Sequence, residues 1–272
     1  MSLPSIKLSQ GIHVMHLFYR IDRNCWAKLP AGESARVQER LAQLAANYAG
    51  PAHPRLMCFA NVGGKADFVF MLYAAELQLV AEMHRELEAV FPAGAISIIY
   101  SYLSVTELPE YVTSDDDLKR MIQHGEQKLQ AGTPEFDQAF AAAKKRNDDY
   151  QFYRLYPELD AWEIMCFYGM SKKRDGQDNW YSLDFDTRKK LMGTHARTGR
   201  KYAGKISQLI TGSTGLDDWE WGVTLMAHRL DDVKGIISEM RFDEVTARFG
   251  DFGPFYINIT LDAAGLWGHL RL

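Results

Sequence analysis

The stretch W-E-W-G-V-T-L-M-A at residues 219–227 alternates large apolar side chains with smaller or polar ones. In an extended chain, Trp219, Trp221, Val223 and Leu225 would lie on one face, as in a strand that buries one side. Residues 207–212 form a shorter run of the same kind just before it. The two runs therefore predict an antiparallel hairpin.

The surroundings of this hairpin predict a βαββαβ unit. Strands are expected at 162–170 and 254–261, with helices at 186–202 and 231–249. The same order occurs earlier in the chain, with strands at 12–21, 56–62, 66–73 and 96–108 and helices at 33–49 and 77–91. This weak internal repeat predicts an α+β fold of two ferredoxin-like units, with their sheets side by side or face to face. We place the domains at 1–109 and 161–272.

Residues 110–160 separate the two units. Charged residues dominate this segment, and apolar residues such as Leu118, Met121 and Phe136 predict short exposed helices around Gly132-Thr133-Pro134. A solvated connector is the expected role.

Composition excludes several classes of function. A net charge of -4 provides no basic field for nucleic acid. The sequence has no apolar run of about 20 residues for a membrane span, and residues 1–10 lack a signal-peptide pattern, so a cytoplasmic location is expected. The three cysteines lack CxxC spacing, which argues against a disulfide framework or a zinc site.

One histidine falls on the buried face of a predicted helix. Leu191, His195, Thr198 and Tyr202 follow helical spacing and point the same way, toward the sheet. His195 is then either a hydrogen-bonded core residue or a ligand.

Several other side chains in this half could carry chemistry. Tyr168 lies near a strand end, four residues before Lys172 and fourteen after Arg154. Such a phenol near cations is either an anchor for a carboxylate or a redox-active group. Arg200 and Arg241 add further cations, although surface exposure is the ordinary explanation for each of them.

Read together, several motifs resemble the chlorite dismutase superfamily and, within it, the bacterial coproheme decarboxylases. The segments that carry the resemblance are N-W-Y at 179–181, T-G-R-K-Y-A-G at 198–204, T-G-S at 211–213, G-L-D-D at 215–218, E-W-G-V-T-L at 220–225 and E-M-R-F-D-E-V at 239–245. The resemblance implies a haem-dependent dimeric α+β barrel.

It also implies roles for individual residues. His195 matches the axial ligand of a haem-type iron, Tyr168 the redox-active tyrosine and Gln208 the residue on the distal side, where chlorite-degrading relatives carry arginine. The implied coproheme-binding set is Arg154, Tyr168, Gly169, Met170, Ser171, Lys172, Arg200, Gln208, Arg241 and Thr246. Lys172 also joins Tyr168 as a catalytic residue.

Two positions depart from the family pattern, and one residue is added to it. Gly169 stands where the family usually has proline, and Thr246 where relatives commonly have serine. We add the hypothesis that Glu244 hydrogen-bonds the proximal imidazole, because a carboxylate there fixes the tautomer and strengthens donation to iron.

The implied reaction is oxidative decarboxylation of two propionates of iron-coproporphyrin III (coproheme) by hydrogen peroxide, which gives haem b and carbon dioxide. The expected partners are the porphyrin itself, a homopentamer of this chain and an iron-inserting coproporphyrin ferrochelatase. Three alternatives stay open: a chlorite dismutase, a non-catalytic haem-binding or haem-transfer protein, and a haem-free barrel in which His195 only packs in the core.

Overall fold

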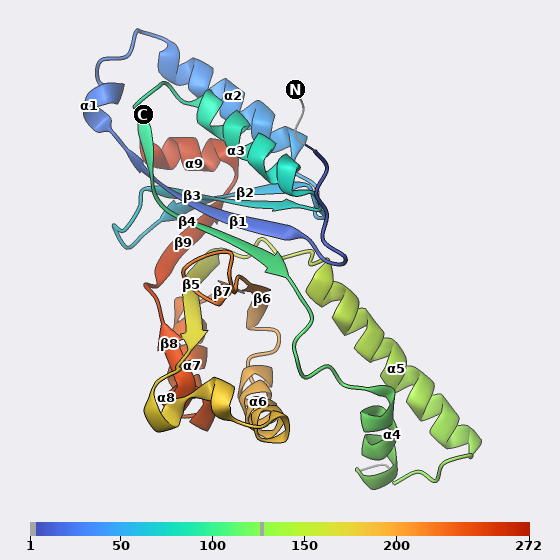
Figure 1. The fold of residues 1–272 in the computed structure, drawn as a ribbon. Coiled ribbons are helices and arrows are strands. Elements are labelled where there is room, and N and C mark those ends of the chain that lie inside the picture. Colours follow the sequence, from blue (N-terminus) through green and yellow to red (C-terminus); the bar gives the residue numbers. More distant parts are fainter. Residues whose placement is uncertain (1–3, 126–127) are drawn as a thin grey trace.

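The computed structural model describes residues 4–125 and 128–272 (Figure 1). The strands within these ranges are β1 (His13–Ile21), β2 (Arg55–Asn61), β3 (Phe68–Ala74), β4 (Ile96–Thr106), β5 (Ile164–Lys172), β6 (Ile206–Gly212), β7 (Trp221–Ala227), β8 (Gly250–Phe252) and β9 (Tyr256–Leu261). The helices are α1 (Arg23–Trp26), α2 (Glu33–Asn47), α3 (Leu77–Val90), α4 (Asp115–His124), α5 (Pro134–Leu155), α6 (Phe185–Arg200), α7 (Leu230–Met240), α8 (Glu244–Phe249) and α9 (Ala263–Leu270), with the 3-10 turns η1 (Gly176–Asp178) and η2 (Trp180–Ser182).

The strands form one antiparallel sheet that closes on itself. Their order is β7-β6-β4-β1-β3-β2-β9-β5-β8, and β5 also pairs with β7. Eight strands therefore make a closed barrel, and β8 extends it along β5. Closure removes the unpaired strand edges that would otherwise invite association with another chain. The predicted α+β fold class is confirmed.

The internal repeat is visible in the strand order. The first half contributes β4-β1-β3-β2, and the second contributes β9-β5-β7-β6, which is the same order for its own four strands. Short pairings join the halves: Val105 and Thr106 of β4 pair with β6, and residues 58–61 of β2 pair with β9. Each half is thus a ferredoxin-like unit whose sheet becomes one side of the barrel.

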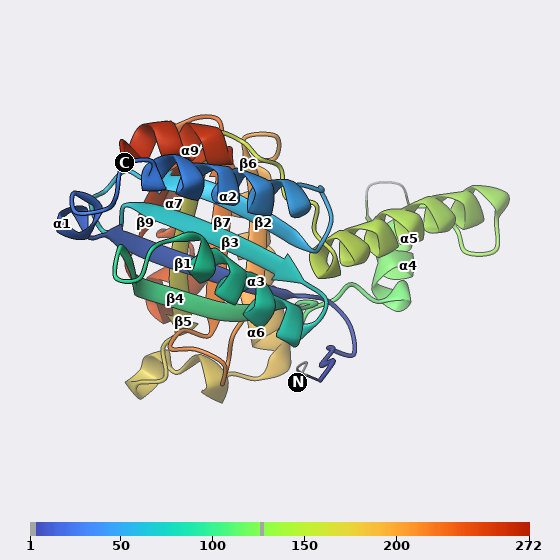
Figure 2. The ribbon, with the colours of Figure 1, turned by 90° about the horizontal axis from the view of Figure 1, so that it is seen from above.

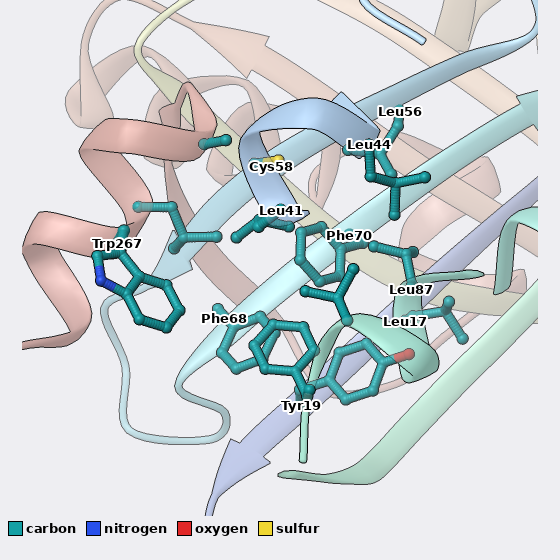
Figure 3. Close-up of a cluster of buried hydrophobic side chains, with 14 of the residues drawn as sticks. Leu17, Tyr19, Leu41, Leu44, Leu56, Cys58, Phe68, Phe70, Leu87 and Trp267 are labelled. Carbon is teal, nitrogen blue, oxygen red and sulfur yellow. The ribbon is translucent and has the colours of Figure 1, made fainter. Parts of the chain in front are cut away.

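Apolar side chains pack on both surfaces of the barrel wall. Over the first half, α2, α3 and α9 cover a cluster in which Leu41, Phe68, Phe70 and Trp267 are buried (Figure 3). Inside the barrel, residues from all eight strands form a second cluster that includes Phe18, Phe167 and Tyr256. Over the second half, α7 covers a third cluster, which includes walls of the site described below.

Three features of the second half differ from the sequence-based prediction. The helix expected at 231–249 is broken, because the chain leaves helical geometry at Asp243, whose side chain bonds to α6 instead. The strand β8 follows α8. Finally, α9 was missed, and it packs on α2 and β2 of the first half as well as on β9.

The connector is more structured than expected. Instead of short helices only, it contains the 22-residue α5, which with α4 projects from the barrel as an arm (Figures 1 and 2). The end of α5 meets the barrel where the Leu155 carbonyl accepts a hydrogen bond from Thr106, and Asp117 of α4 forms an ion pair with Lys189 of α6. The short α4 and the break before Pro134 agree with the prediction, whereas α5 is longer than expected. Among the described residues, no helix is both long and apolar enough to cross a bilayer.

Candidate active-site cavity

A cavity of about 410 Å³ lies between the outer face of the second-half sheet and helices α6 and α7. Because side chains alternate along a strand, every second residue of three neighbouring strands faces it. These residues are Tyr168, Met170 and Lys172 of β5, Gln208 and Ile210 of β6, and Trp221, Val223 and Leu225 of β7. Helices supply the opposite wall, with Met192 and His195 of α6 and Ile236, Ile237 and Met240 of α7.

His195 enters the cavity from α6, as the helical spacing predicted. Its Nδ1 lies 3.1 Å from the Asp243 carboxylate, which also accepts a 2.8 Å hydrogen bond from the Thr198 hydroxyl. Since a carboxylate can only accept, Nδ1 carries the proton and Nε2 keeps its lone pair. Burial, together with the positive charge of Lys172, lowers the pKa of His195. The imidazole is therefore held neutral, the form that binds metal.

The carboxylate partner of His195 is Asp243, and the prediction of Glu244 was wrong by one residue. Glu244 is exposed, and its carboxylate accepts a 2.9 Å hydrogen bond from Arg248 one turn later. Asp243 sits just before α8, outside helical geometry, and so it can turn toward α6.

Tyr168 lies on the sheet side of the cavity. Its ring packs against Phe255 and Phe252, with centroids 4.5 and 5.9 Å away. The side chain is buried, and this burial raises its pKa well above the ordinary tyrosine value, although Arg241 acts in the opposite direction. The phenol is therefore protonated throughout the neutral range.

Lys172 also faces the cavity, four residues after Tyr168 on the same face of β5. Its residue is 8% exposed, and the ammonium lies 4.9 Å from the centre of the Trp180 ring. Burial lowers the pKa of Lys172 to about 8, while the Glu220 carboxylate acts to raise it. A mostly buried ammonium at the wall of a cavity is a strong site for a carboxylate of a ligand.

Arg154 reaches the cavity from the last turn of α5. Its Nη2 donates to the Glu107 carbonyl at 3.4 Å, and its buried Nε has no partner among residues 4–125 and 128–272. A buried guanidinium nitrogen of this kind is ordinarily hydrogen-bonded. A ligand carboxylate would satisfy it.

The remaining predicted residues divide into two groups. Gln208 and Thr246 line the cavity and bring no charge. Gly169 and Ser171 do not line it, because they alternate with Tyr168, Met170 and Lys172 onto the other face of β5. Arg200 and Arg241 are exposed and lie outside the lining, although the Arg241 guanidinium stacks 5.4 Å from the centre of Phe252, which does line it.

Gly169 has a packing role on that other face. A Cβ at this position would lie 2.5 Å from the Trp219 ring. The indole also lies against Gly253, where a Cβ would meet it at 2.8 Å. Trp219 thus precedes β7 and packs behind β5, rather than sharing the cavity face of Trp221 and Val223 as the alternation predicted.

Sequence reasoning missed several lining residues. One side of the cavity is formed by the last residues assigned to the first unit and the first two of the connector, namely Glu107, Leu108, Pro109, Glu110 and Tyr111. Arg188 of α6 fixes this loop through the Tyr111 hydroxyl at 3.0 Å and an ion pair to Glu110. Helical spacing could have identified Met192, which lies three residues before His195 on the same face, whereas no local pattern marks the loop.

The residues of this cavity suit an iron porphyrin. The described part of the chain contains no group of three His, Cys, Asp or Glu side chains that could hold a bare metal ion. An iron already held by four porphyrin nitrogens needs only an axial ligand, which His195 offers. Apolar walls for the macrocycle and buried cations for its propionates complete the fit.

The fold and the site together define a class of protein. It is an α+β barrel with a cavity between the sheet and the helices of its second half, and a histidine points into this cavity. The sequence profile of the chlorite dismutase family matches residues 34–261, and the chain therefore belongs to that family.

Solved structures agree with this assignment. A haem-binding protein from Thermus thermophilus is 35% identical, with a TM-score of 0.77, over 100% of this chain and 99% of that one. A mutant chlorite dismutase from Candidatus Nitrospira defluvii is 17% identical, with a TM-score of 0.71, over 97% and 98% of the two chains. The chlorite dismutase of the same organism in complex with imidazole is 16% identical, with a TM-score of 0.71, over 97% of each chain. The last two likenesses concern the fold alone.

Proposed function

We propose that the protein is a coproheme decarboxylase, which converts two propionates of iron-coproporphyrin III to vinyl groups with hydrogen peroxide and releases haem b. The observation that carries the proposal is that one cavity brings together a neutral histidine, a buried tyrosine and a buried lysine. His195 would ligate iron on the helix side, while Tyr168 and Lys172 face the substrate from the sheet. The relative from Thermus thermophilus, which binds haem, supports the porphyrin part of this proposal.

The substrate brings its own redox centre, because its iron reacts with peroxide and supplies the oxidising power. The protein supplies the residue that reacts with the propionate. Tyr168 gives up one electron and its phenol proton, and the resulting phenoxyl takes a hydrogen atom from the propionate methylene. The burial of Tyr168 keeps water away from this radical.

Each propionate loses two electrons in this reaction. R-CH2-CH2-COO⁻ and H2O2 take up one proton and give R-CH=CH2, CO2 and two H2O. The carbon–carbon bond to the carboxylate breaks after hydrogen abstraction, and the second electron returns to the oxidised centre. Lys172 and Arg154 would hold the carboxylates during these steps, since charge-assisted hydrogen bonds fix orientation.

Gln208 favours this reaction over chlorite chemistry. It lies on the sheet side of the cavity, opposite the helix of His195, and its amide is neutral. A neutral amide provides no fixed cation to hold chlorite or a chlorine–oxygen product. We expect no rapid release of oxygen from chlorite.

The deciding experiment is chromatographic detection of haem b after peroxide is added to the protein with iron-coproporphyrin III. The Tyr168→Phe variant should bind the substrate and form no vinyl product. Tyr256→Phe is the matched control, because this buried tyrosine lies inside the barrel and does not line the cavity. Decarboxylation by Tyr168→Phe at the parental rate would exclude the tyrosyl step.

A second candidate is a non-catalytic haem-binding or haem-transfer protein, and the Thermus thermophilus relative, which binds haem, is compatible with it. It predicts a Soret band on porphyrin addition and no change of porphyrin on peroxide addition. A homopentamer, a cytoplasmic location and transfer of coproheme from a ferrochelatase are further proposals that accompany the enzymatic function. Sedimentation of the purified protein would test the first of them.

A further inference from the structure

Glu220 is a buried carboxylate directly behind the cavity. Its residue is 7% exposed and lies between the turn at 213–219 and the start of β7. Among the described residues it forms no ion pair within 4.0 Å. Since an uncompensated buried charge is costly, such a carboxylate calls for a specific role.

The hydrogen bonds of Glu220 join it to the end of β5. One carboxylate oxygen accepts from the main-chain N–H of Lys172 at 2.8 Å, and the other accepts from the Tyr181 hydroxyl at 2.6 Å. The main-chain N–H of Glu220 in turn donates to the Ser171 hydroxyl at 3.1 Å. Glu220 thus makes contacts to both Ser171 and Lys172 at the end of β5, in addition to the pairing of this end with β8.

The Lys172 side chain, by contrast, has little direct support. Its ammonium lies over the face of Trp180, the residue that precedes Tyr181 on η2. Contact with an indole face stabilises a cation only moderately. This gain is smaller than the free energy of hydration that the ammonium loses on burial. The negative charge of Glu220 opposes this loss and favours the charged form of Lys172.

We propose that Glu220 is a positioning residue, whose carboxylate fixes the end of β5 and keeps Lys172 cationic and ready to receive a propionate. This inference rests on the proposed function, because it assigns Lys172 to a porphyrin carboxylate. Glu220 itself does not line the cavity and acts only through Lys172.

Other charged and titratable groups also face this region. They are His195 from α6, Tyr168 from β5, Tyr181 from η2, Glu107, Glu110 and Tyr111 from the loop after β4, and Arg154 from α5. Tyr168, Tyr111 and Tyr181 have raised pKa values and stay neutral up to alkaline pH. The lowered pKa of His195 keeps the imidazole neutral above the ordinary histidine range. An alkaline loss of binding near pH 8 would therefore belong to Lys172.

The test is the pH dependence of binding of metal-free coproporphyrin III, followed by porphyrin fluorescence. The parent protein should lose affinity as pH rises through about 8, as Lys172 loses its proton. In Glu220→Gln, which keeps the shape and loses the charge, this loss should move to lower pH by about one unit, the size of effect that one nearby charge has. Tyr181→Phe removes a hydrogen bond from the same carboxylate and keeps its charge, so it should retain the parental pH dependence.

Three outcomes would overturn the proposal. These are an unchanged pH dependence in Glu220→Gln, an equal shift in Tyr181→Phe, and failure of Glu220→Gln to fold, which would make the carboxylate a structural group. Lys172→Arg checks the assignment, because a guanidinium does not titrate in this range and should abolish the alkaline loss. Since the assay uses a porphyrin without iron and no peroxide, it gives its answer even if no decarboxylation occurs.

Discussion

The Asp243 carboxylate accepts a hydrogen bond from Nδ1 of His195 over 3.1 Å, although the two residues come from segments 48 positions apart. The same carboxylate receives the Thr198 hydroxyl at 2.8 Å, so a single residue binds two positions on one face of α6. This contact fixes the ring of His195 and leaves Nε2 for a ligand in the cavity. It also explains why the chain breaks between α7 and α8.

The first prediction concerns this contact. Asp243→Asn replaces the charged acceptor by a neutral amide, which donates less electron density to the imidazole and no longer selects one tautomer. We expect affinity for iron-coproporphyrin III to fall by about 10-fold or more, the usual effect of losing such a partner. An absorbance titration measures it. The neighbouring variant Glu244→Gln should bind as the parent does, and equal losses in both variants would contradict the role of Asp243.

The second prediction separates ligation from packing of His195. His195→Ala should weaken binding of iron-coproporphyrin III by more than about 10-fold, since loss of a ligand exceeds loss of its hydrogen-bond partner. Binding of metal-free coproporphyrin III should change little, because the walls and the cations remain. Absorbance and fluorescence titrations give the two affinities. If both porphyrins lose affinity equally, His195 only shapes the cavity.

Local periodicity was enough to predict most strands and the direction of His195, because both depend on spacing within one element. The same alternation could have excluded Gly169 and Ser171 from the lining, since they fall between Tyr168, Met170 and Lys172 on β5. Resemblance named them as binding residues regardless of which face they occupy.

Contacts between distant segments could not be predicted in this way. Closure of the barrel depends on pairing of Val105 with Gly212, which are far apart in the chain. The motif at 239–245 was correctly predicted to supply the carboxylate next to His195, but Glu244 was named in place of Asp243. Local spacing could not decide between them, because the break before α8 determines which acidic side chain turns toward α6. The loop at 107–111 was divided between a predicted strand and the connector, because no local pattern marks the end of β4 at Thr106.

The third prediction concerns Gly169, the glycine that follows Tyr168. In Gly169→Ala, the new methyl group would lie 2.5 Å from the Trp219 ring, which also lies against Gly253. We expect a loss of about 1–3 kcal/mol in the free energy of unfolding, as for other overpacked sites. Gly193→Ala is the opposite case: the position is in α6, is exposed and has nothing within 4 Å of a new Cβ. It should stabilise the protein by about 0.5–1 kcal/mol.

Urea denaturation of the two variants measures both changes. If both Gly169→Ala and Gly193→Ala increased the free energy of unfolding, the Trp219 ring would be able to move aside. The structure would then give no reason for a glycine in place of the usual proline at position 169.

The last prediction concerns acid stability and a histidine inside the barrel. His16 is fully buried against Phe167, with Nε2 3.0 Å from the Thr224 hydroxyl, and burial lowers its pKa to about 3. The unfolded chain binds the proton near pH 6.5, so between these two values the unfolded state holds more protons than the folded one. The contribution of neutral His16 to the free energy of unfolding is therefore complete above pH 6.5. It falls by about 1.4 kcal/mol for each unit that the pH decreases below this value.

His16→Gln keeps a polar partner for Thr224 and cannot titrate. Its free energy of unfolding should fall less steeply than that of the parent between about pH 6 and 4. Some slope should remain, because burial also lowers the pKa of His13 and His195. Parallel slopes for the parent and His16→Gln would mean that the barrel interior opens to water before His16 is protonated.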